Sequence, residues 1–240
     1  MDESLEKKNS VLLTQPGPIS DNQPDKMIVK DTSSASVLQA GISTSWRPGI
    51  SLDTLELAGV RRVGEEEAYR LCRLSASGAW ILYQDVDGKP VLVNDKPYGR
   101  LRLDEPRGNM KYYQVPDSGS HVYIPYPFVE RYKSGEPLYL TEGELKTLAL
   151  AEEGYPSAAL PGFYSYAHGE LLPELKALLN KLQPSKIYFI GDNDTSLNFR
   201  FSIAAVKLAE LVAPIPVFLP RLPLNGPKGI DDFKAEVERE

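Results

Sequence analysis

The sequence of 240 residues is poor in disulfide-forming and metal-binding side chains, with one cysteine and two histidines. A single thiol cannot form an internal disulfide, and the lack of a Cys/His cluster excludes a structural zinc site on this chain. Cys72 lies in a segment with a helical pattern, where we expect a small buried side chain rather than a reactive thiol. His121 and His168 have no partner at ligand spacing, so we expect structural roles for both. A reducing cytoplasm is the expected compartment.

Long hydrophobic runs and an excess of positive charge are also missing. No apolar stretch approaches the ~18 residues of a membrane span, so we expect no membrane partner. The formal net charge is -6 at pH 7, so nucleic-acid binding would need a local basic face on an acidic background. What is present is an ordinary globular composition, 42% hydrophobic and 25% charged, which suits one large domain or two small ones.

Three parts of the chain differ in pattern. Residues 1–36 combine proline, glycine and short polar runs without a sustained period, which predicts a disordered leader. Residues 37–130 indicate an α+β subdomain with a small antiparallel sheet. Residues 131–240 alternate strands with helices, which is typical of a mainly parallel sheet covered by helices on both faces. The expected fold class is therefore α/β, preceded by a smaller α+β subdomain.

The N-terminal subdomain is expected to contain two short helices and five strands. We predict the helices at 51–58 and 65–74, and the strands at 79–83, 91–93, 100–103, 111–113 and 121–124. Asp87-Gly88 is a hairpin dipeptide between the first two strands. Charged and apolar residues alternate over 100–103, so one face of that strand should be buried and the other exposed to water.

In the C-terminal part the alternation of elements places acidic residues at the ends of strands. We predict strands at 138–140, 157–160, 186–190 and 215–219, and helices at 144–153, 170–182, 197–212 and from residue 231 onward. Glu142 follows the first of these strands, and Asp192 and Asp194 follow the third. Because the carboxyl ends of parallel strands meet at one edge of a sheet, we expect these three side chains to lie close together.

The acidic residues form a candidate metal site. Hard divalent cations such as Mg²⁺ or Mn²⁺ prefer carboxylate oxygens, so we expect Glu142, Asp192 and Asp194 to share a cation. Asp231 and Asp232, near the C-terminus, are further candidate ligands. The alternative is that these acids only cap the helices that follow them.

Basic residues supply candidate contacts to phosphate. Lys146 lies one turn into the helix after Glu142, and Lys228 lies shortly before Asp231, so each could contact phosphate or remain solvated. A second group combines cations with aromatic rings, as suits a single-stranded nucleic acid. Its members are Arg100, Arg102, Arg107, Lys111, Tyr112 and Tyr113. The alternative is that these arginines form an ordinary exposed face of a strand.

Three motifs in this order resemble the TOPRIM domain of bacterial primases, topoisomerases and some nucleases. They are Glu142-Gly143 after a strand, Asp192-x-Asp194 after a later strand, and Lys228-Gly-Ile-Asp-Asp-Phe233. The string from Glu142 to Leu150, with Ala159-Leu-Pro-Gly162 downstream, is most similar to the TOPRIM-like domain of primase-helicase proteins of phages, plasmids and genomic islands, the DUF3854 type. With an upstream block that includes Arg100 to Asp104, the resemblance covers roughly residues 38 to 235.

The resemblance implies a TOPRIM-like, Rossmann-like α/β domain and an enzyme of primase type. In such enzymes Glu142, Asp192 and Asp194 would hold Mg²⁺ or Mn²⁺ and bind nucleotide phosphates. The implied partners are single-stranded DNA, nucleoside triphosphates and a replicative helicase in the same or a neighbouring chain. Lys146 departs from the bacterial motif, which more often carries an acid at this position.

Two other functions stay open at this point. One is a non-catalytic module of a replication protein that binds nucleic acid or a partner, which the lack of zinc-binding and helicase segments favours. The other is a metal-dependent nuclease that uses the same acidic site. No isolated tyrosine stands out as a nucleophile among 13, so strand cleavage by tyrosine is disfavoured.

Overall fold

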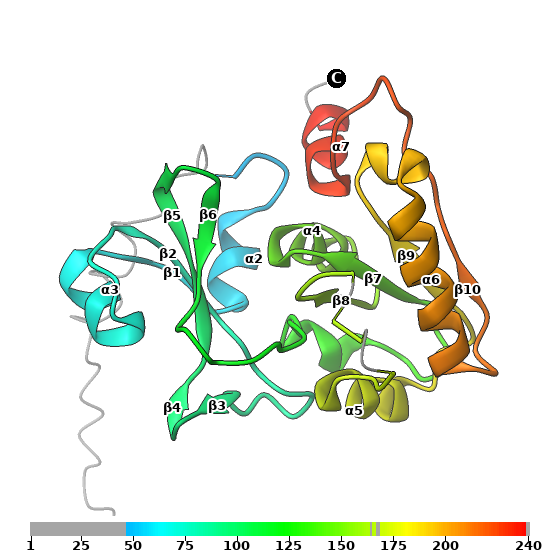
Figure 1. The fold of residues 1–240 in the computed structure, drawn as a ribbon, viewed down its shortest axis with the longest axis horizontal. Helices are drawn as coiled ribbons and strands as arrows, with labels where there is room; N and C mark the ends of the chain where they lie inside the picture. Colours follow the sequence, from blue (N-terminus) through cyan, green and yellow to red (C-terminus); the bar gives the residue numbers. More distant parts are fainter. Residues whose placement is uncertain (1–46, 164, 167–168, 239–240) are drawn as a thin grey trace, which may run out of the picture.

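Two four-stranded sheets organise the chain (Figure 1). The computed structural model describes residues 47–163, 165–166 and 169–238, so the expected leader at 1–36 and His168 lie outside the described residues. The first sheet is antiparallel, in the order β1-β2-β5-β6. Its strands are β1 (Val60–Val63), β2 (Gly78–Leu82), β5 (Gly99–Arg107) and β6 (Met110–Tyr113). A two-stranded sheet joins β3 (Leu92–Val93) to β4 (Lys96–Pro97).

The second sheet is parallel, in the order β10-β9-β7-β8. Its strands are β7 (Leu138–Glu142), β8 (Ser157–Leu160), β9 (Ile187–Ile190) and β10 (Val217–Phe218). The helices that alternate with these strands are α4 (Glu144–Glu152), α5 (Pro173–Leu182), α6 (Phe199–Val212) and α7 (Ile230–Val237). The N-terminal half adds α2 (Leu52–Leu57) and α3 (Glu65–Cys72), and short 3-10 helices occupy η1 (Phe128–Arg131) and η2 (Asn193–Leu197). The predicted α/β fold with a parallel sheet is confirmed.

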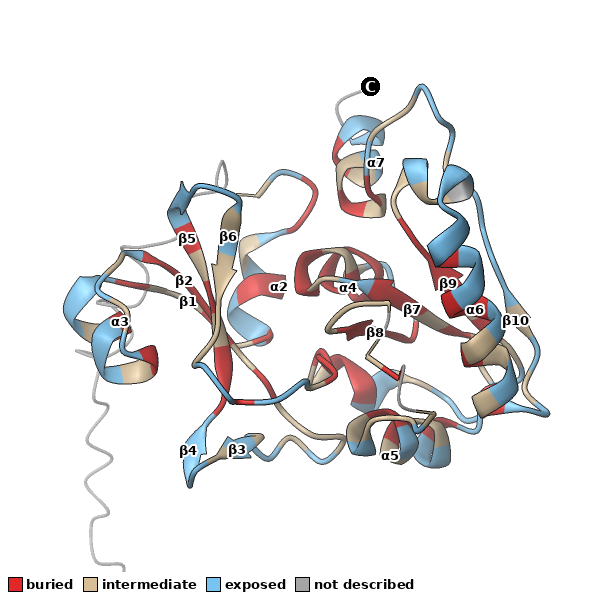
Figure 2. Ribbon diagram, in the orientation of Figure 1, coloured by how far each residue is buried: buried red, intermediate tan, exposed pale blue. Residues whose placement is uncertain are grey.

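Side chains of the parallel sheet alternate between two hydrophobic cores. Leu138 and Leu140 of β7 pack with buried residues of α5 and α6 on one face. Ala159 of β8 belongs to a second core, together with Leu148 of α4 and with Tyr83 beside the antiparallel sheet. Helix α4 therefore lies between the two sheets, and Figure 2 shows it buried along most of its length. A third core places α3 against the other face of the antiparallel sheet.

The segment expected as a strand at 121–124 is not part of the antiparallel sheet. Only Tyr123 makes a bridge, and its partner is Ala159 of β8 in the parallel sheet. Val122 and Ile124 are buried in the core of the parallel sheet, whereas Tyr123 is buried in the core around α4. The alternating pattern therefore arises because this segment runs between two cores, and the prediction was wrong about its partner.

Two predicted helices begin later than expected, for local reasons. Helix α5 starts at Pro173 rather than at residue 170, because proline fits the first helical turn, where its missing N–H costs no hydrogen bond. Helix α6 starts at Phe199, and the Asn198 side chain accepts a hydrogen bond from the backbone N–H of Arg200. The residues before it form η2. This difference matters for the candidate site, because η2 contains Asp194.

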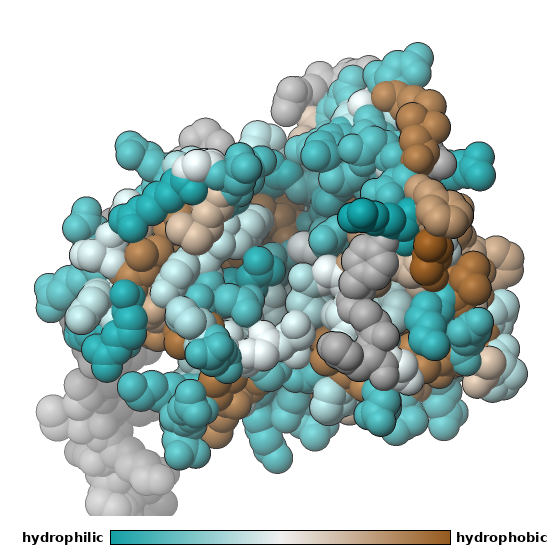
Figure 3. All heavy atoms as spheres, in the orientation of Figure 1, coloured by the Kyte–Doolittle hydropathy of each residue, from teal (hydrophilic) through white to brown (hydrophobic). Residues whose placement is uncertain are grey.

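The surface shows two further features. Cys72 is fully buried, and its thiol donates to the Ala68 carbonyl at 3.2 Å, as expected for a structural cysteine. Helix α6 exposes apolar side chains, among them Phe199 and Val206, and Figure 3 shows hydrophobic residues gathered on this side of the molecule. No helix in the described part of the chain combines the length and apolar character that crossing a membrane requires.

His121 attaches the segment between the sheets to α5. Its Nδ1 lies 2.7 Å from Glu174 Oε1, and its Nε2 lies 2.9 Å from the Ser118 carbonyl oxygen. The hydrogen bond to Glu174 raises the pKa of His121 above its ordinary value. The contact therefore stabilises the fold fully below the unfolded-state pKa of about 6.5, and is lost as the pH rises through the raised folded-state value.

His121→Gln is expected to lower the melting temperature more at pH 6 than at pH 9. Protonated His121 interacts with Glu174 only at the lower pH, so only there does the variant lose an ion pair. Thermal unfolding followed by circular dichroism at both pH values measures the difference. Glu174→Gln is the matched control and should show the same pH dependence; equal losses at both pH values would contradict the assignment.

Candidate metal and nucleic-acid site

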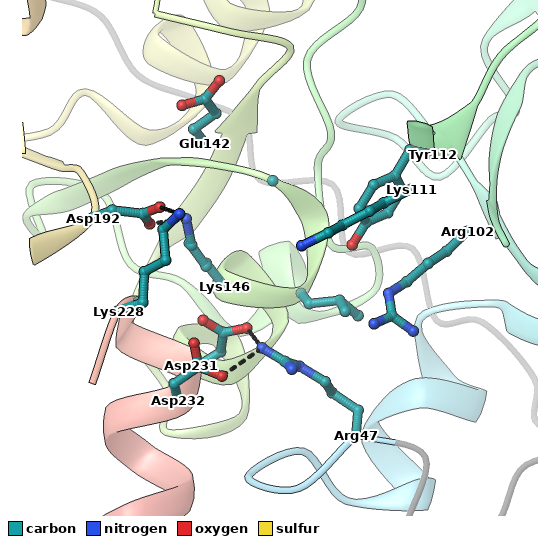
Figure 4. A pocket seen from close by; sticks show the side chains of 13 residues that line it. Arg47, Arg102, Lys111, Tyr112, Glu142, Lys146, Asp192, Lys228, Asp231 and Asp232 are labelled. Carbon is teal, nitrogen blue, oxygen red and sulfur yellow. Dashed lines mark hydrogen bonds and ion pairs between the residues drawn. The ribbon is translucent and has the colours of Figure 1, made fainter. Parts of the chain in front are cut away.

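A cleft of about 280 Å³ lies where the antiparallel sheet faces α4 and α7 (Figure 4). The turn after β7, the segment after β9 and the start of α7 supply acids, while β5 and β6 supply cations and a tyrosine. The lining residues are Arg47, Arg102, Lys111, Tyr112, Glu142, Gly143, Leu145, Lys146, Asp192, Lys228, Gly229, Asp231 and Asp232. Acidic and basic side chains are mixed here, so the cleft suits an anionic ligand that binds together with a cation.

The turn between β7 and α4 brings Glu142 to the cleft. Gly143 has a φ of 102°, a conformation that side-chain-bearing residues rarely adopt, and no atom lies within 4 Å of the position of an added Cβ. The backbone therefore leaves open space in front of this turn. The exposed Glu142 carboxylate lies beside the loop after β8, with Oε1 3.8 Å from the Cβ position of Gly162.

The electrostatic surroundings of Glu142 disfavour its charged form. The pKa of Glu142 is raised, mainly because nearby protein atoms reduce its solvation; Lys146 opposes this shift and Asp192 adds to it. In Figure 4 the Glu142 carboxylate points away from the pair formed by Asp192 and Lys146. A cation bound between Glu142 and Asp192 would remove the repulsion that these carboxylates now exert on each other.

Asp192 is held by two lysines. It follows β9 and precedes η2, at the carboxyl end of a parallel strand as the sequence predicts. Lys146 Nζ of α4 donates to Asp192 Oδ1, and Lys228 Nζ lies 3.6 Å from Asp192 Oδ2. The charge of Asp192 is therefore balanced by lysine side chains in the structure.

Asp231 and Asp232 lie at the start of α7 and contact Arg47. Asp231 is only 3% exposed, and its Oδ2 accepts from Arg47 Nη2. Asp232 Oδ1 lies 3.0 Å from the same nitrogen. Asp231 Oδ1 is buried and has no hydrogen-bond partner among the described residues. A buried carboxylate oxygen without a partner is costly, so this oxygen is a candidate ligand atom for a cation.

Gly229 leaves a small space next to this oxygen. A Cβ at Gly229 would lie 2.6 Å from Asp231 Oδ1, 2.8 Å from Lys146 Cε and 3.6 Å from Asp192 Oδ1. Asp192, Asp231 and Lys146 therefore all come close to one point beside Gly229. A Cβ here would displace the Asp231 or the Lys146 side chain, whereas its distance to Asp192 Oδ1 is an ordinary contact.

Contrary to the prediction from the sequence, the side chains of Glu142, Asp192 and Asp194 do not meet at one point in the structure. Glu142 and Asp192 line the cleft, but Asp194 is exposed and does not line it. The chain turns into η2 directly after Asp192, so the spacing that would place both aspartates on one side of an extended chain does not apply. Across the described residues, no three Asp, Glu, His or Cys side chains are grouped to hold a metal ion.

The oxygen donors nevertheless have the chemistry of a Mg²⁺ or Mn²⁺ site. Glu142, Asp192 and Asp231 all reach the same cleft, and Asp231 brings a buried oxygen without a partner. These donors fit a divalent cation once the side chains turn toward it. The metal roles of the five acids stay predictions.

Three of the six predicted nucleic-acid residues line the cleft. Arg102, Lys111 and Tyr112 reach it from β5 and β6, and Arg102 is paired with Tyr112 in the strand register. Low solvation of the half-buried Tyr112 hydroxyl raises its pKa to about 12, so the ring is neutral at physiological pH. These residues form a basic wall with an aromatic ring opposite the acids.

The other three residues have different surroundings. Arg100 donates to Glu144 Oε1 at 3.0 Å, and its guanidinium lies 5.1 Å from the centre of the Tyr112 ring. Arg107 donates to the Ser75 carbonyl oxygen at 2.8 Å. Tyr113 packs against the core beneath α3. The roles of these three residues in nucleic-acid binding stay predictions. The contacts of Arg100 described here are with other residues of the protein.

Two residues near the site have contacts that the sequence patterns did not predict. Arg47 precedes the first described helix and carries no motif, yet it pairs with acids 184 and 185 positions away. Glu144 has the features of an acid that stabilises the first turn of a helix, and it does occupy that turn, but it is only 1% exposed. Its spacing from Glu142 was visible in the sequence, whereas its burial follows from the packing of the two sheets.

Comparisons with known proteins give one family match and similar folds among solved structures. Residues 130–239 match the profile of the family described as a domain of unknown function (DUF3854). The fold is similar to the primase fragment of the bacteriophage T7 primase-helicase protein, with a TM-score of 0.53 and 18% identity over 82% of this chain and 70% of that chain. It is also similar to the DnaG primase catalytic domain bound to ssDNA, with a TM-score of 0.52 and 15% identity over 87% of this chain and 71% of that chain. No curated protein sequence matches the chain.

The fold and the cleft together define the class. The chain has the fold of a primase catalytic fragment, and the two structural matches extend well beyond the family match into the antiparallel sheet. Residues 130–239 match the DUF3854 family model, and this part of the chain shares the fold of these two primase structures.

Proposed function

We propose that this chain is a primase-type nucleotidyltransferase that uses Mg²⁺ or Mn²⁺ to join nucleotides on a single-stranded DNA template. The observation that carries the proposal is one cleft in which acids at the ends of parallel strands face a basic wall with an aromatic ring. Acids alone would repel a nucleic acid, and cations alone would not hold a divalent metal. A reaction between a nucleoside triphosphate and a DNA or RNA end needs both.

The acids have distinct places in this proposal. Glu142 and Asp192 lie on one side of Lys146 and are the first ligands for a cation, while Asp231 and Asp232 lie on the other side. Asp194 can join them only if η2 rearranges. When bound, the cation would neutralise phosphate charge and make the reacting phosphorus more electrophilic.

The basic residues would position the phosphates. Lys228 keeps 68% of its side chain exposed and Lys146 lies beneath it, so a triphosphate entering the cleft meets Lys228 first. In the reaction a 3′-hydroxyl forms a new bond to the α-phosphorus, and pyrophosphate leaves as the old bond breaks. Water takes up the hydroxyl proton in this proposal, because Glu142 is already assigned to the cation.

Primer synthesis on a single-stranded template tests the proposal. With labelled nucleotides, Mg²⁺ or Mn²⁺ should give short products, and a chelator should abolish them. Such metal-dependent products would support a nucleotidyl transfer at the acidic site. Cleavage of the template without synthesis would favour a metal-dependent nuclease. Strand binding without either reaction would favour the non-catalytic module of a replication protein, and a helicase added to the reaction would then be the next partner to examine.

Arg102→Ala is expected to reduce the salt dependence of single-strand binding. Loss of one phosphate contact lowers the slope of log affinity against log salt by about 0.7 for a single strand. Tyr112→Ala should instead weaken binding by ~1–3 kcal/mol per base with little change in slope. Fluorescence anisotropy at several salt concentrations separates the two effects.

Arg107→Ala is the matched control for Arg102→Ala. It removes the same charge from the same strand, but Arg107 is bonded to the Ser75 carbonyl and does not line the cleft. We expect it to change the slope less. If all three variants bind like wild type at every salt concentration, the antiparallel sheet is only a scaffold.

A further inference from the structure

A lysine occupies the middle of the acidic cluster. Lys146 lies in the first turn of α4, and its Nζ donates to Asp192 Oδ1. Its Cε lies 2.8 Å from the Cβ position of Gly229, the same point that Asp231 Oδ1 approaches at 2.6 Å and Asp192 Oδ1 at 3.6 Å. The side chain therefore fills the space between Asp192 and Asp231.

The surrounding contacts hold Lys146 in place. Its side chain is only 20% exposed, and Asp192 is only 22% exposed, so the ion pair is shielded from water. Helix α7, which carries Asp231, is joined to α4 by Lys234, whose Nζ bonds Glu152 and lies 3.0 Å from Glu153. Contacts outside the cleft thus tie α7 to α4 independently of Lys146.

Asp231 Oδ1 marks a second place where a cation would fit. This oxygen is buried and has no hydrogen-bond partner among the described residues, although the other carboxylate oxygen is paired with Arg47. It lies 2.6 Å from the Cβ position of Gly229, which Asp192 Oδ1 approaches at 3.6 Å. Two metal ions that share a carboxylate in phosphoryl-transfer sites lie about 3.5–4 Å apart. An ammonium group in contact with Asp192 would repel a second divalent ion bound on that side of the carboxylate.

We infer that the cleft binds one divalent cation per chain, on the Glu142 side of Asp192, and that Lys146 supplies from the protein the positive charge of a second ion. The inference rests on the proposed metal-dependent function and specifies how its site is occupied. In this inference the Lys146 ammonium group neutralises the acids of the cleft and does not contact phosphate directly. It also explains why Asp231 keeps an oxygen without a partner: the position beside it is filled by the aliphatic part of a lysine instead of a cation.

The number of bound ions tests the inference. Titration of the full chain with Mn²⁺, followed by isothermal calorimetry and by electron paramagnetic resonance of free Mn²⁺, should give one ion per chain for wild type. Lys146→Asp removes the ammonium and adds a carboxylate, so two ions per chain are expected. Lys146→Asn removes only the charge and serves if the aspartate variant does not fold; a second, weaker ion is expected with it.

Two control variants test whether the number of bound ions depends on Lys146 and Asp231 specifically. Lys111→Asp makes the same charge change in the same cleft, but from β6, and should leave one ion per chain. Lys146→Asp combined with Asp231→Asn should return the number from two to one, because the second ion would need Asp231 Oδ1. Circular dichroism spectra confirm that each variant is folded.

The outcomes separate the inference from the function on which it rests. Two ions in wild type together with primer synthesis would overturn the inference and leave the function standing. One ion in wild type and still one in both folded Lys146 variants would also overturn the inference, since the lysine would then exclude nothing. No Mn²⁺ binding by wild type at millimolar concentration would overturn the inference and the metal-dependent function together.

Discussion

Asp192→Asn is expected to abolish Mn²⁺ binding, whereas Asp194→Asn should bind Mn²⁺ with nearly the wild-type affinity. Asp192 lines the cleft beside Glu142, at the end of β9. Asp194 lies two residues further on, exposed on η2 and outside the cleft. Removing a residue that only hydrogen-bonds a metal ligand weakens metal affinity by roughly 10- to 100-fold. Removing the ligand itself should weaken the affinity more. Isothermal calorimetry with Mn²⁺ measures both variants.

The two aspartates form a matched pair, because both substitutions remove one negative charge within three residues of chain. A general electrostatic effect of net charge would therefore weaken binding equally in both variants. Equal losses would contradict the expectation and would show that η2 rearranges to bring Asp194 to the cation. Wild-type affinity in both variants would remove Asp192 from the metal site altogether.

Asp192→Asn should also lower the melting temperature in the presence of a chelator. A cluster of acids without metal is usually destabilised by repulsion, so neutralising one of them would be expected to help. In this structure Asp192 is instead the partner of Lys146, whose side chain is 20% exposed. Its removal leaves a shielded lysine without that partner, which reverses the expected sign.

Glu144→Gln is expected to destabilise the protein by about 3 kcal/mol, the lower end of the range for breaking a buried ion pair. Glu144 is 1% exposed, and its Oε1 accepts hydrogen bonds from Tyr83 at 2.6 Å and from Arg100 at 3.0 Å. Glutamine keeps the size of the side chain but leaves the Arg100 charge uncompensated. We choose the lower end of the range because the Arg100 side chain retains 22% exposure. Urea unfolding measures the free energy.

Glu153→Gln is the matched control for this pair. Glu153 also belongs to α4, at its C-cap, and lies 3.0 Å from Lys234, but its side chain is 52% exposed. An exposed ion pair contributes about 0–1 kcal/mol, so a small change is expected. Replacing both partners with apolar residues, as in Glu144→Leu with Arg100→Met, should recover much of the loss. A Glu144→Gln variant as stable as Glu153→Gln would contradict the expectation and would show that water solvates the Arg100 charge when Glu144 is neutral.

The Glu144–Arg100 pair also bears on function, since it joins the two halves of the cleft. Glu144 lies two residues after Glu142, and Arg100 belongs to the strand that carries Arg102. The pair is therefore a direct contact between the turn that presents Glu142 and the sheet that presents the basic wall. A stable interface between the halves keeps the acids and cations of the cleft at a fixed separation.

Local patterns in the sequence determined the elements of this protein and the ends at which its acids lie. The strand at 157–160 is found where its apolar run predicts it, and Glu142 and Asp192 lie at the carboxyl ends of parallel strands. These features depend on periodicity and on turn residues within a few positions, so a single chain contains the necessary information. The alternation over 100–103 likewise predicted that Leu101 and Leu103 would be buried, and they are.

Only the tertiary structure decided which charged residues meet. Lys146 contacts Asp192 across 46 positions, Arg100 contacts Glu144 across 44, and Arg47 contacts Asp231 across 184. Pairings over such separations follow from how α4 is enclosed between the sheets and how α7 packs on α4, and no local pattern encodes them. The same packing turned Arg100 inward and left Asp194 outside the cleft, because a side chain's partners are set by the surfaces around it.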